Sequence, residues 1–242
     1  MISSPCVLES AFVLHSRPYQ NTSLLVDLLT KQHGRIAVIA RSARGLKSRY
    51  RGRLELFTPI LASWRGKHEL KSLGTVDFVD TAPIILLEGE RLSCGFYLNE
   101  LLFRLLHRDD PHPTLFEEYQ CALERLAGDA CIHMTLRRFE KVLLTKLGYA
   151  LPLCEEAQTR FPIESHAFYE YYPETGFKRV QPFRKKRHRP TFSGKSLIAL
   201  RNDQFEDVEI LKELKELLQI SLQFYLNYKP IRSRELFQSL SD

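Results

Sequence analysis

Short apolar runs separated by turn residues occupy the first third of the chain, and their spacing is typical of β-strands. Five such runs lie at residues 7–15, 23–30, 35–40, 54–64 and 69–79. His33-Gly34 between the second and third runs suits a hairpin, because glycine supplies the positive φ that a tight turn requires. Five short strands without a long intervening helix predict a small barrel of the OB type, with an SH3-like barrel as the alternative.

Beyond Pro83 the apolar positions recur three and four residues apart, which is the spacing of an amphipathic helix. This pattern predicts helices at residues 91–106, 113–126, 134–147, 193–201, 206–227 and 234–240. Gly148 suits the end of the third helix, and Ser193 can cap the start of the fourth. Between them, aromatic residues alternate before the turn Pro173-Glu-Thr-Gly176, so residues 167–180 are predicted to form a hairpin.

These elements predict an α+β fold with two domains. Residues 1–81 are expected to form a five-stranded OB-fold barrel that binds nucleic acid. Residues 82–242 are expected to form an all-α helical bundle, with a small irregular hairpin insertion at about 152–192.

The composition is that of an ordinary globular protein, with 44% hydrophobic and 26% charged residues among 242. We expect no membrane span, because no run of about 18 apolar residues occurs, and the first residues do not resemble a secretory signal. A cytoplasmic location follows as an expectation. The chain has five widely spaced cysteines and no CxxC pair, which argues against a disulfide framework and against a zinc ribbon. They are Cys6, Cys94, Cys121, Cys131 and Cys154.

Positive charge is concentrated in the first third of the chain. Residues 1–80 contain 12 lysines and arginines against 6 acids, whereas residues 81–242 contain 23 of each. Within residues 31–53 there are cations and no acid, and like charges packed so closely repel one another unless an anion lies opposite. A cationic arm between two strands of a small barrel can place several donors along a phosphate backbone. The predicted phosphate-binding residues are Arg35, Arg41, Arg44, Lys47, Arg49, Arg51 and Arg53.

Aromatic rings could assist such binding, and Tyr50 and Trp64 are candidates for stacking on bases. A second basic cluster, at residues 183–189, could extend the same surface or be a solvated loop. Its candidate residues are Lys185, Lys186 and Arg187.

Arg137 and Arg138 begin a segment of the third helix whose other face is apolar, so they could hold the acidic, apolar tail of a partner protein. The alternative is a surface arginine paired with Glu140.

No stretch of the sequence displays a complete catalytic or metal-binding motif. His107, Asp109, Asp110 and His112 lie together, but they fall where one helix ends and the next begins, where Asp and Pro serve the backbone. Gly194-Lys195-Ser196 lacks the earlier glycine of a phosphate-binding loop, since position 189 is Arg. We therefore expect no enzyme activity, no cofactor and no metal.

Three segments together resemble the RecO family of bacterial DNA repair proteins. They are residues 11–60, 136–151 and 229–237, and the order Gly34, Ala40-Arg41, Lys47-Ser48-Arg49 and Arg51-Gly52 is the specific part. The resemblance implies an OB-fold domain followed by a helical domain in a mediator of homologous recombination. It also implies binding to single- and double-stranded DNA, annealing of complementary strands, and help in loading RecA onto DNA coated by single-stranded-DNA-binding protein.

The resemblance further implies partners and residue roles. RecR and the acidic C-terminal tail of the single-stranded-DNA-binding protein are the implied partners, RecF and RecA are possible ones, and the implied location is cytoplasmic at the nucleoid. The basic residues from Arg41 to Arg53 become the DNA-contacting face, and the region of Arg137 and Arg138 becomes the tail pocket. Some family members carry a four-cysteine zinc motif after the third helix, whereas this chain has only Cys154 there, and one thiol cannot make a tetrahedral site.

The residues alone leave three other functions open. An RNA-binding OB protein could use the same basic residues. A metal-dependent nuclease could use His107, Asp109, Asp110 and His112, and a pure scaffold would bind proteins but no nucleic acid.

Overall fold

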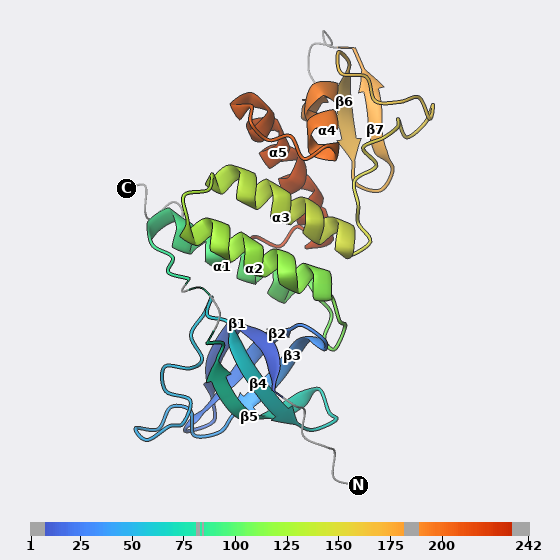
Figure 1. Cartoon of the computed structure of the whole chain (residues 1–242). Helices are drawn as coiled ribbons and strands as arrows, with labels where there is room; N and C mark the ends of the chain where they lie inside the picture. The colour runs from blue at the N-terminus through green and yellow to red at the C-terminus, as the bar shows by residue number, and fades with distance from the viewer. Residues whose placement is uncertain (1–7, 81–82, 84, 182–188, 234–242) are drawn as a thin grey trace. The chain divides into compact units, whose positions relative to one another are not determined.

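The computed structural model describes the chain except for residues 1–7, 81–82, 84, 182–188 and 234–242 (Figure 1). The contacts divide it into two compact units, which are described separately below. Unit 1 contains Met1–Asp129 and Ile231–Asp242, and unit 2 contains Ala130–Pro230. Among the described residues, no helix is long and apolar enough to cross a membrane.

Unit 1 contains a closed five-stranded barrel, which confirms the predicted OB-type architecture (Figure 1). Its strands are β1 (Glu9–Tyr19), β2 (Ser23–Thr30), β3 (Gly34–Ala40), β4 (Ile60–Arg65) and β5 (Leu70–Phe78). Their order around the barrel is β1-β2-β3-β5-β4, and β1 pairs with β4 to close it. The β3–β5 pair is parallel and the other pairs are antiparallel, as in a small Greek-key barrel.

The two sides of the barrel strands have different partners within unit 1. Val13, Val26 and Val38 belong to the core inside the barrel. Phe12 is next to Val13 in sequence, so its side chain lies on the opposite face, and its ring centroid is 5.1 Å from that of Tyr119 on α2 (Pro113–Ala127). Asn99 on α1 (Gly89–Leu105) donates to the Leu14 carbonyl at 3.0 Å. The first two helices therefore pack on the barrel.

The compact units are not the predicted domains, because α1 and α2 belong with the barrel. The boundary between residues 81 and 82 stays a prediction about how the chain is organised into domains. It can be tested by truncation.

The described residues of unit 2 form three helices and a small sheet. α3 (Ile132–Lys146) packs against α5 (Val208–Tyr225), and α4 (Gly194–Arg201) packs against α5 as well. The predicted hairpin is confirmed as β6 (Phe168–Tyr172) paired with β7 (Gly176–Val180). A short strand, β8 (Thr191–Ser193), was not predicted and pairs with the other edge of β6.

The aromatic alternation that predicts the hairpin also builds its core, since Tyr169, Tyr171 and Phe177 are buried. The Ser193 side chain accepts from the backbone N–H of Ser196 and caps α4, as predicted. The helix predicted at residues 234–240 lies outside the described residues.

Candidate nucleic-acid interface

The basic loop, defined here as residues 41–53, leaves the barrel after β3 and is held by its own backbone. Gly45 donates to Ser42, Ser48 to Gly45, and Arg51 to Ser48, each through a main-chain hydrogen bond of 3.1–3.3 Å. Arg44 donates its backbone N–H to the Thr22 carbonyl at 2.8 Å, which ties the loop to the turn between β1 and β2. Successive turns therefore shape a segment whose cations would otherwise drive it apart.

Tyr50 anchors the end of the basic loop to the barrel. Its hydroxyl lies 2.9 Å from the Leu73 carbonyl and 3.0 Å from the Gly74 carbonyl on β5, and it donates toward them. Arg49 donates to the same hydroxyl at 2.6 Å, and its guanidinium lies 4.8 Å from the centre of the tyrosine ring. A buried phenol needs such partners, so Tyr50 fixes where the neighbouring cations emerge.

The stacking role predicted for Tyr50 and Trp64 is wrong. Both rings are buried in the core of the barrel, and Trp64 packs edge-on against His33 at 5.3 Å between ring centroids. A nucleotide base cannot reach a ring whose faces are already covered. The basic loop therefore presents charge without an accessible aromatic ring of its own.

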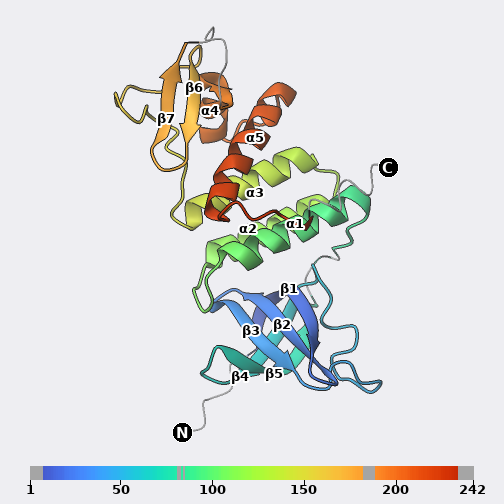
Figure 2. The same ribbon diagram turned by 180° about the vertical axis from the view of Figure 1, so that it is seen from behind.

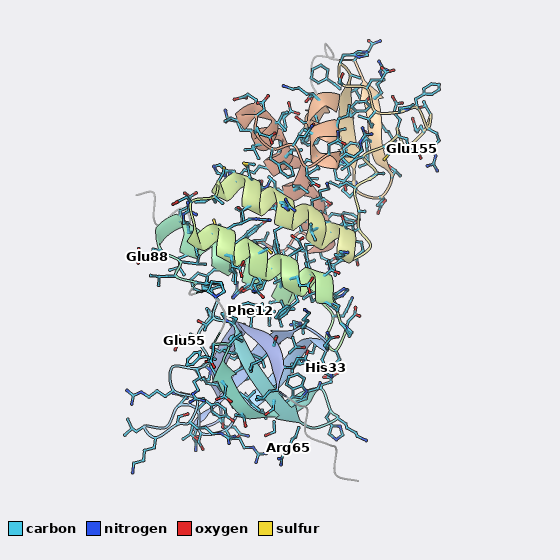
Figure 3. All side chains as sticks on the ribbon, in the orientation of Figure 1. Phe12, His33, Glu55, Arg65, Glu88 and Glu155 are labelled. Carbon is cyan, nitrogen blue, oxygen red and sulfur yellow. The ribbon has the colours of Figure 1, made fainter. Side chains whose placement is uncertain are left out.

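Besides Arg49, which is exposed but held by the Tyr50 hydroxyl, four cations of the basic loop have exposed side chains: Arg41, Arg44, Lys47 and Arg51. Among the described residues, none of the four forms an ion pair with an acid. Figure 3 shows long side chains extending into solvent from this part of unit 1, beyond Glu55. Unpaired cations on a fixed loop can exchange their counterions for phosphates.

Arg53 and Arg35 are engaged by the protein. The Arg53 guanidinium donates to the Val76 carbonyl at 2.6 Å and to Asp77 at 2.8 Å. Arg35 lies at the start of β3, at the other end of that strand from the basic loop, and pairs with Asp27 at 3.4 Å over the Phe103 ring. Burial lowers the pKa of Arg35, while the charge of Asp27 opposes this shift. The DNA contacts predicted for Arg53 and Arg35 stay predictions. The pairing of Arg35 with Asp27, at the far end of β3 from the basic loop, disfavours a DNA contact by Arg35.

The second basic cluster lies almost wholly outside the described part of the chain, including Lys185, Lys186 and Arg187. Its last residue, Arg189, lies 4.7 Å from the ring centre of Tyr172, and Lys178 lies 4.4 Å from the same ring. The DNA contacts predicted for Lys185–Arg187 therefore remain predictions.

Two family comparisons cover nearly the whole chain. The model described as "Recombination protein O N terminal" matches residues 6–82, and the one described as "Recombination protein O C terminal" matches residues 86–235. The chain belongs to the RecO family. This confirms the resemblance carried by residues 11–60, 136–151 and 229–237.

Curated RecO relatives are similar along most of their lengths. "DNA repair protein RecO" of Coxiella burnetii (strain RSA 331) is 52% identical over 229 residues, which are 95% of this chain and 97% of the relative. The Yersinia pestis (strain Pestoides F) protein of the same name is 39% identical over 231 residues, 95% of this chain and 93% of the relative. The Burkholderia pseudomallei (strain 1710b) protein of the same name is 37% identical over 234 residues, which are 97% of this chain and 84% of the relative. The chain is thus a member of a family of DNA repair and recombination proteins.

In this RecO-family chain the two candidate partner-binding arginines differ sharply. Arg137 is buried and donates to Glu140 at 2.7 Å, one helical turn along α3. The sequence leaves a pairing with Glu140 open as the alternative, but for a surface arginine, whereas Arg137 is buried. A buried charge is costly without its partner, so Glu140 holds Arg137 in the interior. Arg138 is exposed and is the more accessible cation of the two.

Asp109, between α1 and α2, attaches this segment to the barrel of the RecO-family chain. Asp109 pairs with Lys71 on β5 at 2.5 Å, and its backbone N–H donates to the Arg35 carbonyl at 2.9 Å. Asp110 pairs with His112 at 3.2 Å. In the described part of the chain, no group of three or more His, Cys, Asp or Glu side chains could hold a metal ion. Cys154 is exposed and not in a disulfide.

Sequence reasoning missed the anchoring role of Tyr50 and the pairing of Arg53 with Asp77. In both cases the partner residues lie on β5, which comes close to the basic loop only in the folded barrel. It also missed the stacking of Tyr149 on Tyr225, whose rings come from segments far apart in the chain. The sequence signal for this stack is no more than a tyrosine that directly follows Gly148, the glycine predicted to end a helix.

Proposed function

We propose that this RecO-family protein is a non-enzymatic recombination mediator. It binds single- and double-stranded DNA through the basic loop, anneals complementary strands and, together with RecR, assists loading of RecA onto DNA coated by single-stranded-DNA-binding protein. The observation that supports this is the set of four exposed, unpaired cations, Arg41, Arg44, Lys47 and Arg51, on an anchored loop of an OB barrel.

The mechanism rests on charge neutralisation. Two DNA strands repel each other through their phosphates, and cations that release counterions from both strands lower that repulsion. Annealing then needs no covalent step, so a protein without a catalytic site can promote it. The loop's rigidity limits the entropy lost on binding, because Tyr50 and the backbone turns already hold the cations in place. The setting of this activity is the bacterial cytoplasm at the nucleoid.

Recruitment to coated DNA belongs to the helical part of the chain. Arg138 is exposed on α3 and can attract the acidic tail of the single-stranded-DNA-binding protein, while Arg137 is committed to Glu140. RecF and RecA are further candidate partners. We assign the tail contact to Arg138 in preference to Arg137 because of this difference in burial.

Strand annealing tests the proposal directly. Two complementary labelled oligonucleotides are mixed bare, or precoated with single-stranded-DNA-binding protein, with wild type or with the double variant Arg41→Glu, Lys47→Glu. We expect the double variant to anneal at least tenfold more slowly on both substrates. The matched control is Lys212→Glu with Lys215→Glu, which makes the same change in charge at exposed positions of α5 and should anneal like wild type.

Two outcomes would contradict the proposal. If the double variant and the control slow annealing equally, net charge matters and the basic loop does not. If wild type binds DNA but anneals neither substrate, the mediator function is wrong. A higher affinity for RNA than for DNA at equal salt would then favour the RNA-binding alternative.

The salt dependence of DNA binding reports the number of phosphates that the basic loop contacts. For single-stranded DNA the slope of log K against log salt falls by about 0.7 for each phosphate contact removed. We expect the triple variant Arg41→Gln, Arg44→Gln, Lys47→Gln to lower the slope by about 2 relative to wild type. Fluorescence anisotropy at four salt concentrations measures it, with Lys212→Gln as the control. An unchanged slope would mean that these cations do not contact phosphate.

A further inference from the structure

Figure 2 shows the C-terminal ends of α3 and α5 side by side in unit 2. Four aromatic side chains gather there. The rings of Tyr149 and Tyr225 are stacked, with centroids 3.9 Å apart and planes only 15° apart. Phe224 lies edge-on to Tyr225 at 5.2 Å and to Tyr228 at 6.3 Å. We call this cluster of Tyr149, Phe224, Tyr225 and Tyr228 the tyrosine face.

The tyrosine face is open to solvent at its two ends. Tyr149 is 37% exposed and Tyr228 is 70% exposed, while Phe224 and Tyr225 are half-buried. Burial, with a smaller contribution from Tyr149, raises the pKa of Tyr225. Open rings here contrast with the barrel, where Tyr50 and Trp64 are both covered.

Tyr228 lies just after the end of α5, where its backbone N–H donates to the Gln223 carbonyl at 2.8 Å. Its backbone has φ of 56°, a left-handed conformation that bulky residues rarely adopt and that glycine or asparagine adopts easily. The preceding Asn227 is in the same conformation, with φ of 53°. A strained backbone that presents a mostly exposed ring fits a residue that contacts something outside the chain.

The two segments that supply the rings of the tyrosine face contain lysines. Residues 141–153 and 217–231 supply its rings, and these segments contain Lys141, Lys146 and Lys229 but no Asp or Glu. Lys141 is engaged by Asp203 at 2.8 Å. Lys146 and Lys229 are exposed, the first three residues before Tyr149 and the second directly after Tyr228. Open rings bordered by cations complement a ligand with planar apolar groups along a chain of anions.

We propose that the tyrosine face binds single-stranded DNA, with bases stacked on Tyr149 and Tyr228 and phosphates facing Lys146 and Lys229. A single strand fits better than a duplex, because duplex bases already cover each other's faces. This inference rests on the proposed function for its nucleic-acid partner and adds a second contact surface, separate from the basic loop. The loop supplies charge, whereas the tyrosine face supplies the accessible rings that the loop lacks.

Photo-crosslinking locates the contact. A single-stranded oligonucleotide containing 5-iodouracil is bound to the full-length protein and irradiated, and the attached peptides are identified by mass spectrometry. We expect cross-links at Tyr149 or Tyr228. Cross-links confined to other parts of the chain would overturn the inference.

Ring-specific variants test the energetics. Tyr228→Leu keeps an apolar side chain but removes the ring, and should weaken binding of the single strand roughly tenfold, within the range of base stacking. Tyr228→Phe keeps the ring and should bind within about twofold of wild type. Phe161→Leu is the matched control, because Phe161 is another exposed aromatic residue of unit 2, at 64%. Duplex affinity should be unchanged in all three.

The same measurements separate this inference from the proposed function. If Arg41→Glu with Lys47→Glu weakens binding but leaves the tyrosine cross-links, both surfaces bind DNA. If only Tyr228→Leu weakens binding, the tyrosine face is supported and the basic loop is not. If Tyr228→Leu binds DNA like wild type but loses affinity for an acidic, apolar peptide, the face is a protein-docking site and the inference is wrong. Thermal melting monitored by circular dichroism verifies that each variant is folded.

Discussion

Gly34 illustrates how one residue can satisfy two constraints. Its φ of 66° suits the tight turn that the sequence predicts between β2 and β3. The structure adds a second reason, because a Cβ atom at this position would lie only 1.9 Å from the carbonyl oxygen of Asp110. The segment between α1 and α2 thus packs directly on the barrel at a point where only hydrogen fits.

We expect Gly34→Ala to destabilise unit 1 by about 3 kcal/mol, from left-handed strain together with the clash against backbone. Gly52→Ala is the control, because Gly52 has a similar φ of 69° but a Cβ there meets nothing within 4 Å. It should cost about 1 kcal/mol. Urea unfolding followed by the fluorescence of Trp64 measures both. Equal losses would mean that the contact with Asp110 yields easily.

At the scale of elements, α1 holds the returning C-terminal segment through one carboxylate. Glu100 accepts the backbone N–H of Arg232 at 3.0 Å and that of Ser233 at 2.7 Å, and it also pairs with Arg104 at 3.0 Å. Burial alone would raise the pKa of Glu100, but the hydrogen bonds from Ser233, Arg232 and Arg104 outweigh it and hold the pKa below its ordinary value of 4.5. The ionised form is therefore favoured by folding.

This depressed pKa predicts how the contact depends on pH. Glu100 stabilises the fold fully above its unfolded-state pKa, and the contribution is lost as the pH falls through the lower folded-state pKa. Glu100→Gln should therefore be about 1–2 kcal/mol less stable than wild type at pH 7, and the gap should shrink below about pH 4.5. Urea unfolding at several pH values measures the gap, with exposed Glu55→Gln as control. A gap that does not change with pH would exclude this role for the charge.

At the scale of the whole molecule, the chain passes between the two units twice, after Asp129 and after Pro230. The final segment thus belongs to unit 1, where Ile231 is buried and Glu100 binds the backbone. Unit 1 is made from both ends of the chain. The predicted domain of residues 82–242 would instead keep this segment apart from the barrel.

Truncation after Pro230 distinguishes these organisations. The truncated chain loses the burial of Ile231 and the hydrogen bonds to Glu100, so unit 1 should be destabilised by about 3 kcal/mol. Trp64 is the only tryptophan and lies buried in the barrel, so its fluorescence in urea reports unit 1. An unchanged Trp64 transition, with loss of helical signal alone, would instead favour a domain boundary between residues 81 and 82.

Periodicity in the sequence predicted the barrel strands, the described helices and the β6–β7 hairpin, because each depends on a repeat within a short stretch. The charge of the basic loop is likewise visible in the sequence. The short strand β8 was missed, since three residues are too few to show alternation. The start of the fourth strand was placed too early, at Leu54, because the apolar residues before Ile60 pack on the barrel, with Leu56 forming only an isolated bridge to Val13 and no continuous ladder.

The sequence by itself determined the kinds of elements, the family and where the positive charge is concentrated, because these are properties of neighbouring residues. Only the tertiary structure decided which charges and rings are accessible. Arg53 is engaged by Asp77 and Arg137 is buried with Glu140, while Tyr50 anchors a loop and Tyr149 stacks on Tyr225. Most of these partners come from distant parts of the chain, and burial depends on what packs over a residue, so no local pattern could reveal them.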